Sequence, residues 1–226
     1  ACSTGPSMTG EAARGRLALP ARTVESRVVV VARAQRAEDY DAVLDVLLEA
    51  GIRSVELTLT TPGTFDRLPE LIERYGDAAD LGVGTVTDGD QLARAIDAGA
   101  HYAVTPITSP ALVAQATDAG VPIIPGGLTP TELFASWSAG ASAVKVFPAG
   151  VVGPSYLKDL RGPFPDIVAV PSGGIDLDSA GAWLAAGAVA VSVGGPLLGD
   201  AFRGGDLRAL RDRAAAFVAA AVPEAA

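Results

Sequence analysis

Short apolar runs alternate with longer amphipathic segments along most of this chain. A short, continuous apolar run is typical of a strand buried on both faces, and apolar residues repeating every three or four positions are typical of a helix. The apolar runs are residues 28–33, 54–59, 81–85, 102–105, 122–125, 143–147, 167–171 and 188–193. The helical patterns are residues 37–50, 62–75, 88–98, 110–119, 130–139, 153–160, 176–186 and 206–221. The chain is therefore predicted to contain eight successive strand–helix units.

The ends of the predicted helices carry recurring signals. Asp88, Ser109 and Thr129 stand where a side chain can cap the first turn, and the last two are followed by proline. Glycine follows alanine where five of the helical patterns end, which is typical of a helix C-terminus: these are Gly51, Gly99, Gly120, Gly140 and Gly187. The same unit therefore repeats along the chain.

Repeated strand–helix units predict an α/β fold with a parallel sheet, and eight units fit a single closed TIM (β/α)8 barrel. An open doubly wound sheet is the alternative, disfavoured because no Gly-x-Gly-x-x-Gly turn follows the first strand. We predict one barrel domain over residues 23–226. Residues 1–22 have no period and are predicted to be a disordered tail, with Met8 as a candidate native start and residues 1–7 as a cloning remnant.

Composition narrows the class of function. The formal net charge of −9 argues against nucleic acid as a partner, because phosphate binding needs clustered lysine and arginine. No apolar run approaches the roughly 20 residues of a membrane span, and no signal-peptide stretch opens the chain. With Cys2 as the single cysteine and His101 as the single histidine, neither a disulfide framework nor a His/Cys metal site is expected. We expect a cytoplasmic protein that needs no metal and no cofactor.

Three charged residues interrupt the apolar strands: Arg33, Glu56 and Lys145. A buried charge is costly unless it is paired or used. Because alternate side chains of a strand share a face, the aliphatic neighbours of Glu56 and Lys145 are expected to face the helices. Glu56 and Lys145 should then point into the barrel, near the C-terminal strand ends where TIM barrels hold their active sites.

The choice of lysine at position 145 is informative in itself. The chain has two lysines, Lys145 and Lys158, against fifteen arginines. A buried lysine can lose its proton and attack a carbonyl, which arginine cannot do. The alternative is a buried Lys145–Glu56 ion pair without chemistry. For Arg33 the alternative to a binding role is a salt bridge at the barrel mouth, and His101 and Lys158 are expected to be non-catalytic.

Glycine-rich turns follow the last two strands, at residues 171–174 and 193–196. In TIM barrels this pair of loops often binds a phosphate through backbone N–H groups. Arg33 ends the first strand, which neighbours the eighth in a closed barrel, so it could assist in binding an anion.

These residues together resemble the 2-keto-3-deoxy-6-phosphogluconate (KDPG) and 4-hydroxy-2-oxoglutarate (KHG) aldolase family, which includes the phosphogalactonate aldolases. The matching stretches span about residues 26–200 and are 51–59 (GIRSVELTL), 82–86 (GVGTV), 104–106 (VTP), 124–126 (IPG), 129–133 (TPTEL), 144–148 (VKVFP) and 171–175 (PSGGI). The resemblance implies a homotrimer of TIM barrels that acts on small keto acids in the Entner–Doudoroff pathway.

The resemblance also implies roles for individual residues. Lys145 would form a Schiff base with the keto acid and Glu56 would be the general acid and base. The other implied residues fall into two groups, a keto-acid pocket made by Thr85, Pro106 and Phe147, and a site for the phosphate or distal acid made by Arg33, Ser172, Gly173, Gly174, Gly194 and Gly195.

Two departures from the family pattern concern the distal site. Thr60 stands where some members have arginine, and Pro196, which has no N–H, stands where some have serine. The expected reaction is cleavage of KDPG to pyruvate and glyceraldehyde 3-phosphate, with KHG cleavage also plausible. The alternatives are a phosphogalactonate aldolase, another phosphate-binding barrel such as an epimerase, and a non-catalytic trimeric scaffold.

Overall fold

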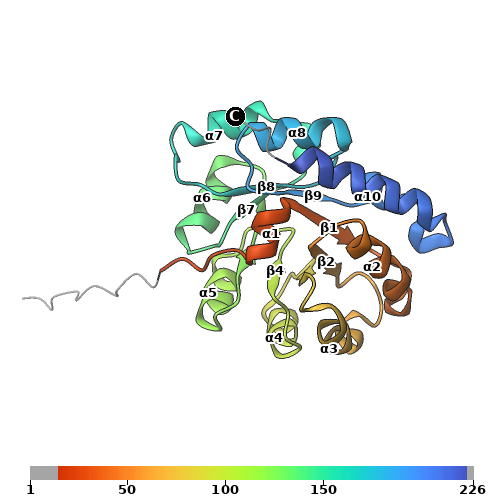
Figure 1. Cartoon of the computed structure of the whole chain (residues 1–226). Coiled ribbons are helices and arrows are strands. Elements are labelled where there is room, and N and C mark those ends of the chain that lie inside the picture. The colour runs from red at the N-terminus through yellow and green to blue at the C-terminus, as the bar shows by residue number, and fades with distance from the viewer. Residues whose placement is uncertain (1–14, 223–226) are drawn as a thin grey trace, which may run out of the picture.

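The computed structural model describes residues 15–222, which form nine short strands and ten α-helices (Figure 1). The strands are β1 (Val28–Ala32), β2 (Ser54–Thr58), β3 (Asp80–Gly84), β4 (Tyr102–Val104), β5 (Ile123–Ile124), β6 (Gly126–Gly127), β7 (Val144–Val146), β8 (Ala169–Pro171) and β9 (Val191–Val193). The α-helices are α1 (Ala21–Ser26), α2 (Tyr40–Glu49), α3 (Thr64–Tyr75), α4 (Gly89–Asp97), α5 (Pro110–Asp118), α6 (Pro130–Ser138), α7 (Ser155–Arg161), α8 (Leu177–Ala185), α9 (Gly195–Leu198) and α10 (Leu207–Ala221). Single 3₁₀ turns η1, η2 and η3 span Ala37–Asp39, Ala149–Val151 and Ala201–Arg203.

All strand pairs are parallel, and they close into a barrel. One sheet runs in the order β5-β4-β3-β2-β1-β9 and the other in the order β6-β7-β8. β5 and β6 are one barrel strand interrupted at Pro125, whose nitrogen carries no hydrogen for the ladder. A bridge between Ser172 and Ser192 joins β8 to β9, and β9 pairs with β1. The closed ring confirms the predicted TIM barrel and excludes the open doubly wound sheet.

Strand alternation separates an inner core from an outer one, as the sequence predicted. The outer core lies between strands and helices and includes Val55, Leu57, Val144 and Val146, all fully buried. A smaller cluster fills the barrel and is made by Leu19, Val29, Tyr102, Val104, Ile124, Ala143, Val170 and Ala190. Ala143, which directly precedes β7, belongs to the inner cluster. Because alternate residues along a strand share a face, Lys145 also points inward.

The predicted disordered tail over residues 1–22 is too long. Helix α1 begins at Ala21, inside that range, and lies in front of the strands in Figure 1. Leu19 is buried in the inner cluster, and the guanidinium of Arg16 stacks 3.3 Å from the ring centroid of Trp137. These contacts explain why residues 15–22 have a defined position. Residues 1–14, which include Cys2 and Met8, lie outside the described residues.

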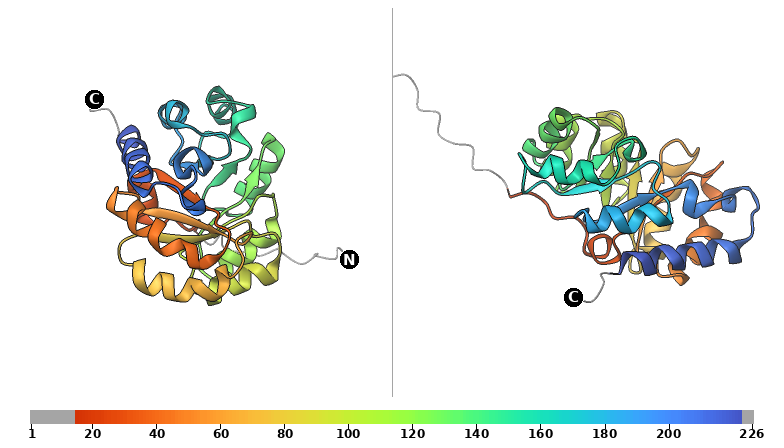
Figure 2. Two further views of the ribbon diagram at one scale, coloured as in Figure 1. Left: turned by 90° about the vertical axis from the view of Figure 1, so that its right-hand side faces the viewer. Right: turned by 90° about the horizontal axis from the view of Figure 1, so that it is seen from above.

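The helices surround the strands, and α10 packs against both α2 and α8, which closes the outer ring (Figure 2). The five predicted glycine stops all have positive φ, between 74° and 104°. Within residues 15–222, no helix is long and apolar enough to cross a membrane. The predicted helices lie close to their expected positions, whereas α9 and η3, after the last strand, were not predicted.

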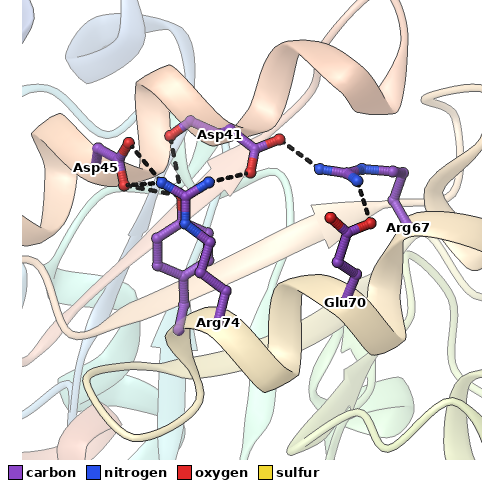
Figure 3. Close-up of polar contacts among 6 residues, drawn as sticks. Asp41, Asp45, Arg67, Glu70 and Arg74 are labelled. Atoms are coloured by element: carbon purple, nitrogen blue, oxygen red, sulfur yellow. Dashed lines mark hydrogen bonds and ion pairs between the residues drawn. The ribbon is translucent and has the colours of Figure 1, made fainter.

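A charged network joins α2 to α3 on the outer surface (Figure 3). Asp41 accepts hydrogen bonds from Arg67 and, at 2.9 Å, from Arg74. Arg74 also reaches Asp45 at 3.1 Å, and the Tyr75 hydroxyl donates to Asp45 at 2.8 Å. Exposed ion pairs contribute little individually, so this network mainly fixes the register of two helices far from the inward-facing charges.

Candidate active site

The two inward charges predicted from the sequence meet at the floor of one cavity. The Nζ of Lys145 on β7 lies 3.6 Å from the Oε2 of Glu56 on β2. Their side chains are 9% and 2% exposed, respectively. The Lys145 main-chain N–H donates to the Pro125 carbonyl at 2.8 Å, and this bond holds the backbone of β7 in place at Lys145. The pair is thus buried, close enough for proton transfer after a small movement, and open only toward the cavity.

Gly84 at the end of β3 leaves the space that the Glu56 carboxylate fills. A Cβ at position 84 would lie 1.9 Å from Oε1 of Glu56 and 2.4 Å from its Cδ. The ladder of β2 with β3 pairs Thr58 with Gly84, so the glutamate side chain leans over the neighbouring strand toward its C-terminal end. Glycine at this position is therefore part of how the fold orients Glu56.

Gly84→Ala is expected to disable the site without unfolding the chain. The added methyl group must displace the Glu56 carboxylate from Lys145, and a misplacement of about 1 Å can cost about a hundredfold in rate. The measurement is the steady-state rate of keto-acid cleavage, with a thermal melt to confirm folding. Gly181→Ala on α8, where an added Cβ has no neighbour within 4 Å, is the matched control and should keep full activity. An active Gly84→Ala enzyme would contradict the importance of this packing.

The residues predicted to line a keto-acid pocket surround this pair. Thr85, Pro106 and Phe147 all border the cavity. The Lys145 Nζ lies 5.3 Å from the centroid of the Phe147 ring. Thr85 has a φ of 63°, which is strained for a β-branched residue, and such strain concentrates at functional sites. The three residues therefore border the same cavity as the Lys145 amine.

The residues predicted for the distal group border the same cavity, which has a volume of about 500 Å³. They are Arg33, Ser172, Gly173, Gly174, Gly194 and Gly195. Glycine is favoured at position 173 on two grounds: its φ is 82°, and an added Cβ would lie only 3.1 Å from the Phe147 ring. Within residues 15–222, the backbone N–H groups of these four glycines make no hydrogen bond to the protein. They are available to an anionic group.

Sequence reasoning missed Arg203, which follows α9 in η3 and also borders the cavity. Arg33, Lys145 and Arg203 are the basic side chains among the described cavity residues, and Glu56 is the acidic one. In the described part of the chain, neither Arg33 nor Arg203 forms an ion pair. The salt bridge considered for Arg33 is therefore not seen. The cavity carries a net positive charge on a protein whose formal charge is −9.

The two departures from the family pattern have different positions. Pro196 borders the cavity, whereas Thr60 is exposed and its hydroxyl turns back to Thr58 at 3.1 Å. His101 lies before β4, at the opposite end of the barrel, where its Nδ1 accepts a hydrogen bond from the Leu81 N–H at 3.0 Å. Lys158 is exposed on α7. Neither His101 nor Lys158 belongs to the cavity.

Comparison with known proteins identifies the family. The model of the KDPG and KHG aldolase family matches residues 20–211. The chain belongs to this family. Its members are aldolases, so the chain is a carbon–carbon lyase of the class I, Schiff-base type, and the predicted resemblance is confirmed.

Individual relatives differ in the substrate they are named for. A 2-dehydro-3-deoxy-6-phosphogalactonate aldolase of Escherichia coli is 31% identical over 85% of this chain and 93% of its own length. A 2-dehydro-3-deoxy-phosphogluconate aldolase of Pseudomonas aeruginosa is 36% identical over 71% of this chain and 73% of its own. A Legionella pneumophila KDPG aldolase structure, with pyruvate captured as a covalent carbinolamine, is 28% identical, with a TM-score of 0.80 and coverage of 87% and 96%.

Proposed function

We propose that this aldolase cleaves a 2-keto-3-deoxy-6-phospho sugar acid, the gluconate or its galactonate epimer, into pyruvate and glyceraldehyde 3-phosphate through a Schiff base on Lys145. The observation that carries the proposal is the 3.6 Å contact between the Lys145 amine and the Glu56 carboxylate inside a basic cavity. A buried ion pair is a weak stabiliser, so its position at the C-terminal end of a barrel favours a chemical role.

The reaction begins at the substrate C2 carbonyl. The lone pair of the Lys145 amine forms a bond to C2, and the carbonyl oxygen takes up a proton to give a carbinolamine. Loss of water then leaves a protonated Schiff base, which draws electrons from the adjacent carbons. Glu56 lies close enough to Lys145 to deliver and remove the protons of these steps.

Cleavage follows from the same pair. Glu56 removes the proton of the C4 hydroxyl, directly or through a water, and the C3–C4 bonding electrons move into the Schiff base. The aldehyde leaves, and an enamine of pyruvate remains on Lys145. Protonation of its terminal carbon, C3 of the substrate, by Glu56 and hydrolysis of the Schiff base release pyruvate and restore the amine. Protons and electrons balance without an external oxidant or reductant.

The charge of the cavity supports a substrate that is anionic at both ends. The keto acid end carries a carboxylate near Lys145, and a phosphate at the other end would find Arg33, Arg203 and the free N–H groups of the Gly-Gly turns. Arginine suits a phosphate because its planar donors match the phosphate oxygens.

Arg203→Gln is expected to raise KM for the phosphorylated substrate by about tenfold, with kcat changed much less. An exposed charge-assisted contact contributes on the order of 1 to 2 kcal/mol, which corresponds to that factor. Arg33→Gln should act in the same direction. The measurement is cleavage kinetics at low and high salt, since the effect should shrink as salt rises. Arg208→Gln, on the exposed side of α10, is the control, and an unchanged KM in both cavity variants would contradict the assignment.

The second candidate substrate is 4-hydroxy-2-oxoglutarate, whose distal group is a carboxylate. Pro196 favours it, because proline withdraws one N–H from the turn that would bind a phosphate. A cleavage assay of all three keto acids tests both proposals. We expect the highest kcat/KM for a phosphorylated substrate, and the reverse order would assign the chain to the hydroxy-oxoglutarate.

We also propose that the enzyme is a cytoplasmic homotrimer. The family resemblance supports the trimer, and the single cysteine fits a reducing compartment. Light scattering should give three times the 22.7 kDa chain mass. A monomeric mass at micromolar concentration would refute the trimer.

A further inference from the structure

Tyr102 occupies the barrel interior directly beneath Glu56. The strand register places Glu56 opposite Gly82 and Gly82 opposite Tyr102, so the three residues form one row across β2, β3 and β4. A Cβ on Gly82 would lie 2.3 Å from Cε2 of Tyr102. The tyrosine ring therefore crosses β3 over the bare backbone of Gly82 and is fully buried.

A network of hydrogen bonds anchors the hydroxyl of this ring. The Tyr102 hydroxyl lies 3.0 Å from Ser54 Oγ, which lies 2.8 Å from Thr23 Oγ1, which lies 2.9 Å from Asp80 Oδ2. The Thr23 main-chain N–H donates to the same carboxylate oxygen at 2.8 Å, and Arg22 approaches its other oxygen at 3.5 Å. The network ties the tyrosine to helix α1 at the closed end of the barrel.

The carboxylate sets the direction of every bond in the chain. Thr23 gives its hydroxyl hydrogen to the Asp80 carboxylate, so the Thr23 oxygen must accept from Ser54. Ser54 has then used its own hydrogen and must accept from Tyr102. The phenol hydrogen of Tyr102 consequently points away from Glu56, and the tyrosine presents its ring to the site.

The phenol also stays neutral. Burial raises the pKa of Tyr102, the hydrogen bond with Ser54 opposes that shift, and the charges of Glu56 and Asp80 add to it. A neutral ring with its hydroxyl turned away can neither exchange a proton with Glu56 nor repel it. What it can do is exclude water and close the space below the carboxylate.

We propose that Tyr102 is a positioning residue. Its ring, anchored to α1 by the hydrogen bonds through Ser54 and Thr23, keeps the Glu56 carboxylate next to the Lys145 amine. The inference rests on the proposed role of Glu56 in catalysis. Gly84 and Tyr102 act together. The glycine leaves space for the Glu56 carboxylate toward the C-terminal ends of the strands, and the tyrosine ring fills the space on the side of α1. Without the ring, the carboxylate can bend into the barrel and admit water.

The test compares Tyr102→Phe with Tyr102→Leu. Phenylalanine keeps the ring and should keep kcat within about twofold. Leucine removes the planar ring and should lower kcat by about tenfold to a hundredfold while KM changes less than threefold, because the acid–base group rather than substrate binding is disturbed. Tyr75→Leu, a buried tyrosine at the end of α3 outside the cavity, is the matched control and should leave kcat unchanged.

The outcomes separate the inference from the proposed function. A folded Tyr102→Leu enzyme with wild-type kcat overturns the positioning role alone, as does a Tyr102→Phe enzyme as impaired as the leucine variant. If Tyr102→Leu lacks a cooperative thermal melt, Tyr102→Met is measured in its place, and failure of both to fold assigns the residue to stability and overturns the proposal. A wild-type chain whose Lys145 is not labelled by pyruvate and borohydride refutes the proposed function, and this inference with it.

Discussion

Replacing Lys145 with arginine is expected to abolish aldol cleavage while leaving the fold intact. Arginine preserves the positive charge beside Glu56, so the ion pair survives, but its guanidinium remains protonated and cannot attack a carbonyl. The measurement is pyruvate release coupled to a reductase. The expected rate is the assay background, because no other amine borders the cavity within residues 15–222.

Borohydride reduction in the presence of pyruvate locates the amine directly. The reduced adduct should add one pyruvyl group to Lys145, found by mass spectrometry of the digested chain, and a chelator should not prevent it. Lys158 is the only other lysine and lies exposed on α7, which makes Lys158→Arg a matched control that should react and turn over normally. Labelling at Lys158 alone, or full activity in Lys145→Arg, would refute the Schiff-base assignment.

Strand alternation was enough to predict both members of the central pair. Val144 and Val146 are aliphatic and Lys145 is not, and on a strand buried on both faces this pattern leaves only the barrel interior for the amine. The same logic placed Glu56 between Val55 and Leu57. Their meeting at 3.6 Å depends on β2 and β7 facing each other across a closed ring, which eight repeated units already implied.

Other features could not be derived from local sequence pattern. The residues between the last strand and the last helix have no clear period, so α9, η3 and the position of Arg203 emerge only from the folded chain. Helix α1 has six residues and is held by Thr23 and Asp80, contacts between distant parts of the chain. The roles of Gly82 and Gly84 also depend on which side chains lean across them from neighbouring strands.

Glu56→Gln is expected to lower kcat by about a hundredfold to ten-thousandfold, the usual contribution of a general acid–base group. Glutamine has nearly the same shape as glutamate, so the space beside Gly84 stays filled, but the amide can neither accept nor return a proton. KM should change little, because Arg33, Arg203 and the glycine turns are untouched. Glu49→Gln, on the exposed end of α2, is the control for the substitution itself.

The same variant separates proton transfer from a purely electrostatic role. If Glu56 moves protons, Glu56→Gln should also lose exchange of the pyruvate methyl hydrogens with deuterium oxide, since that exchange forms and protonates the enamine without cleaving a carbon–carbon bond. Borohydride should still trap pyruvate on Lys145, although more slowly. If exchange continues at the wild-type rate while cleavage fails, another group protonates the enamine, and Glu56 acts only on the C4 hydroxyl. If cleavage also continues, the 3.6 Å pair is structural and its chemistry belongs to Lys145 alone.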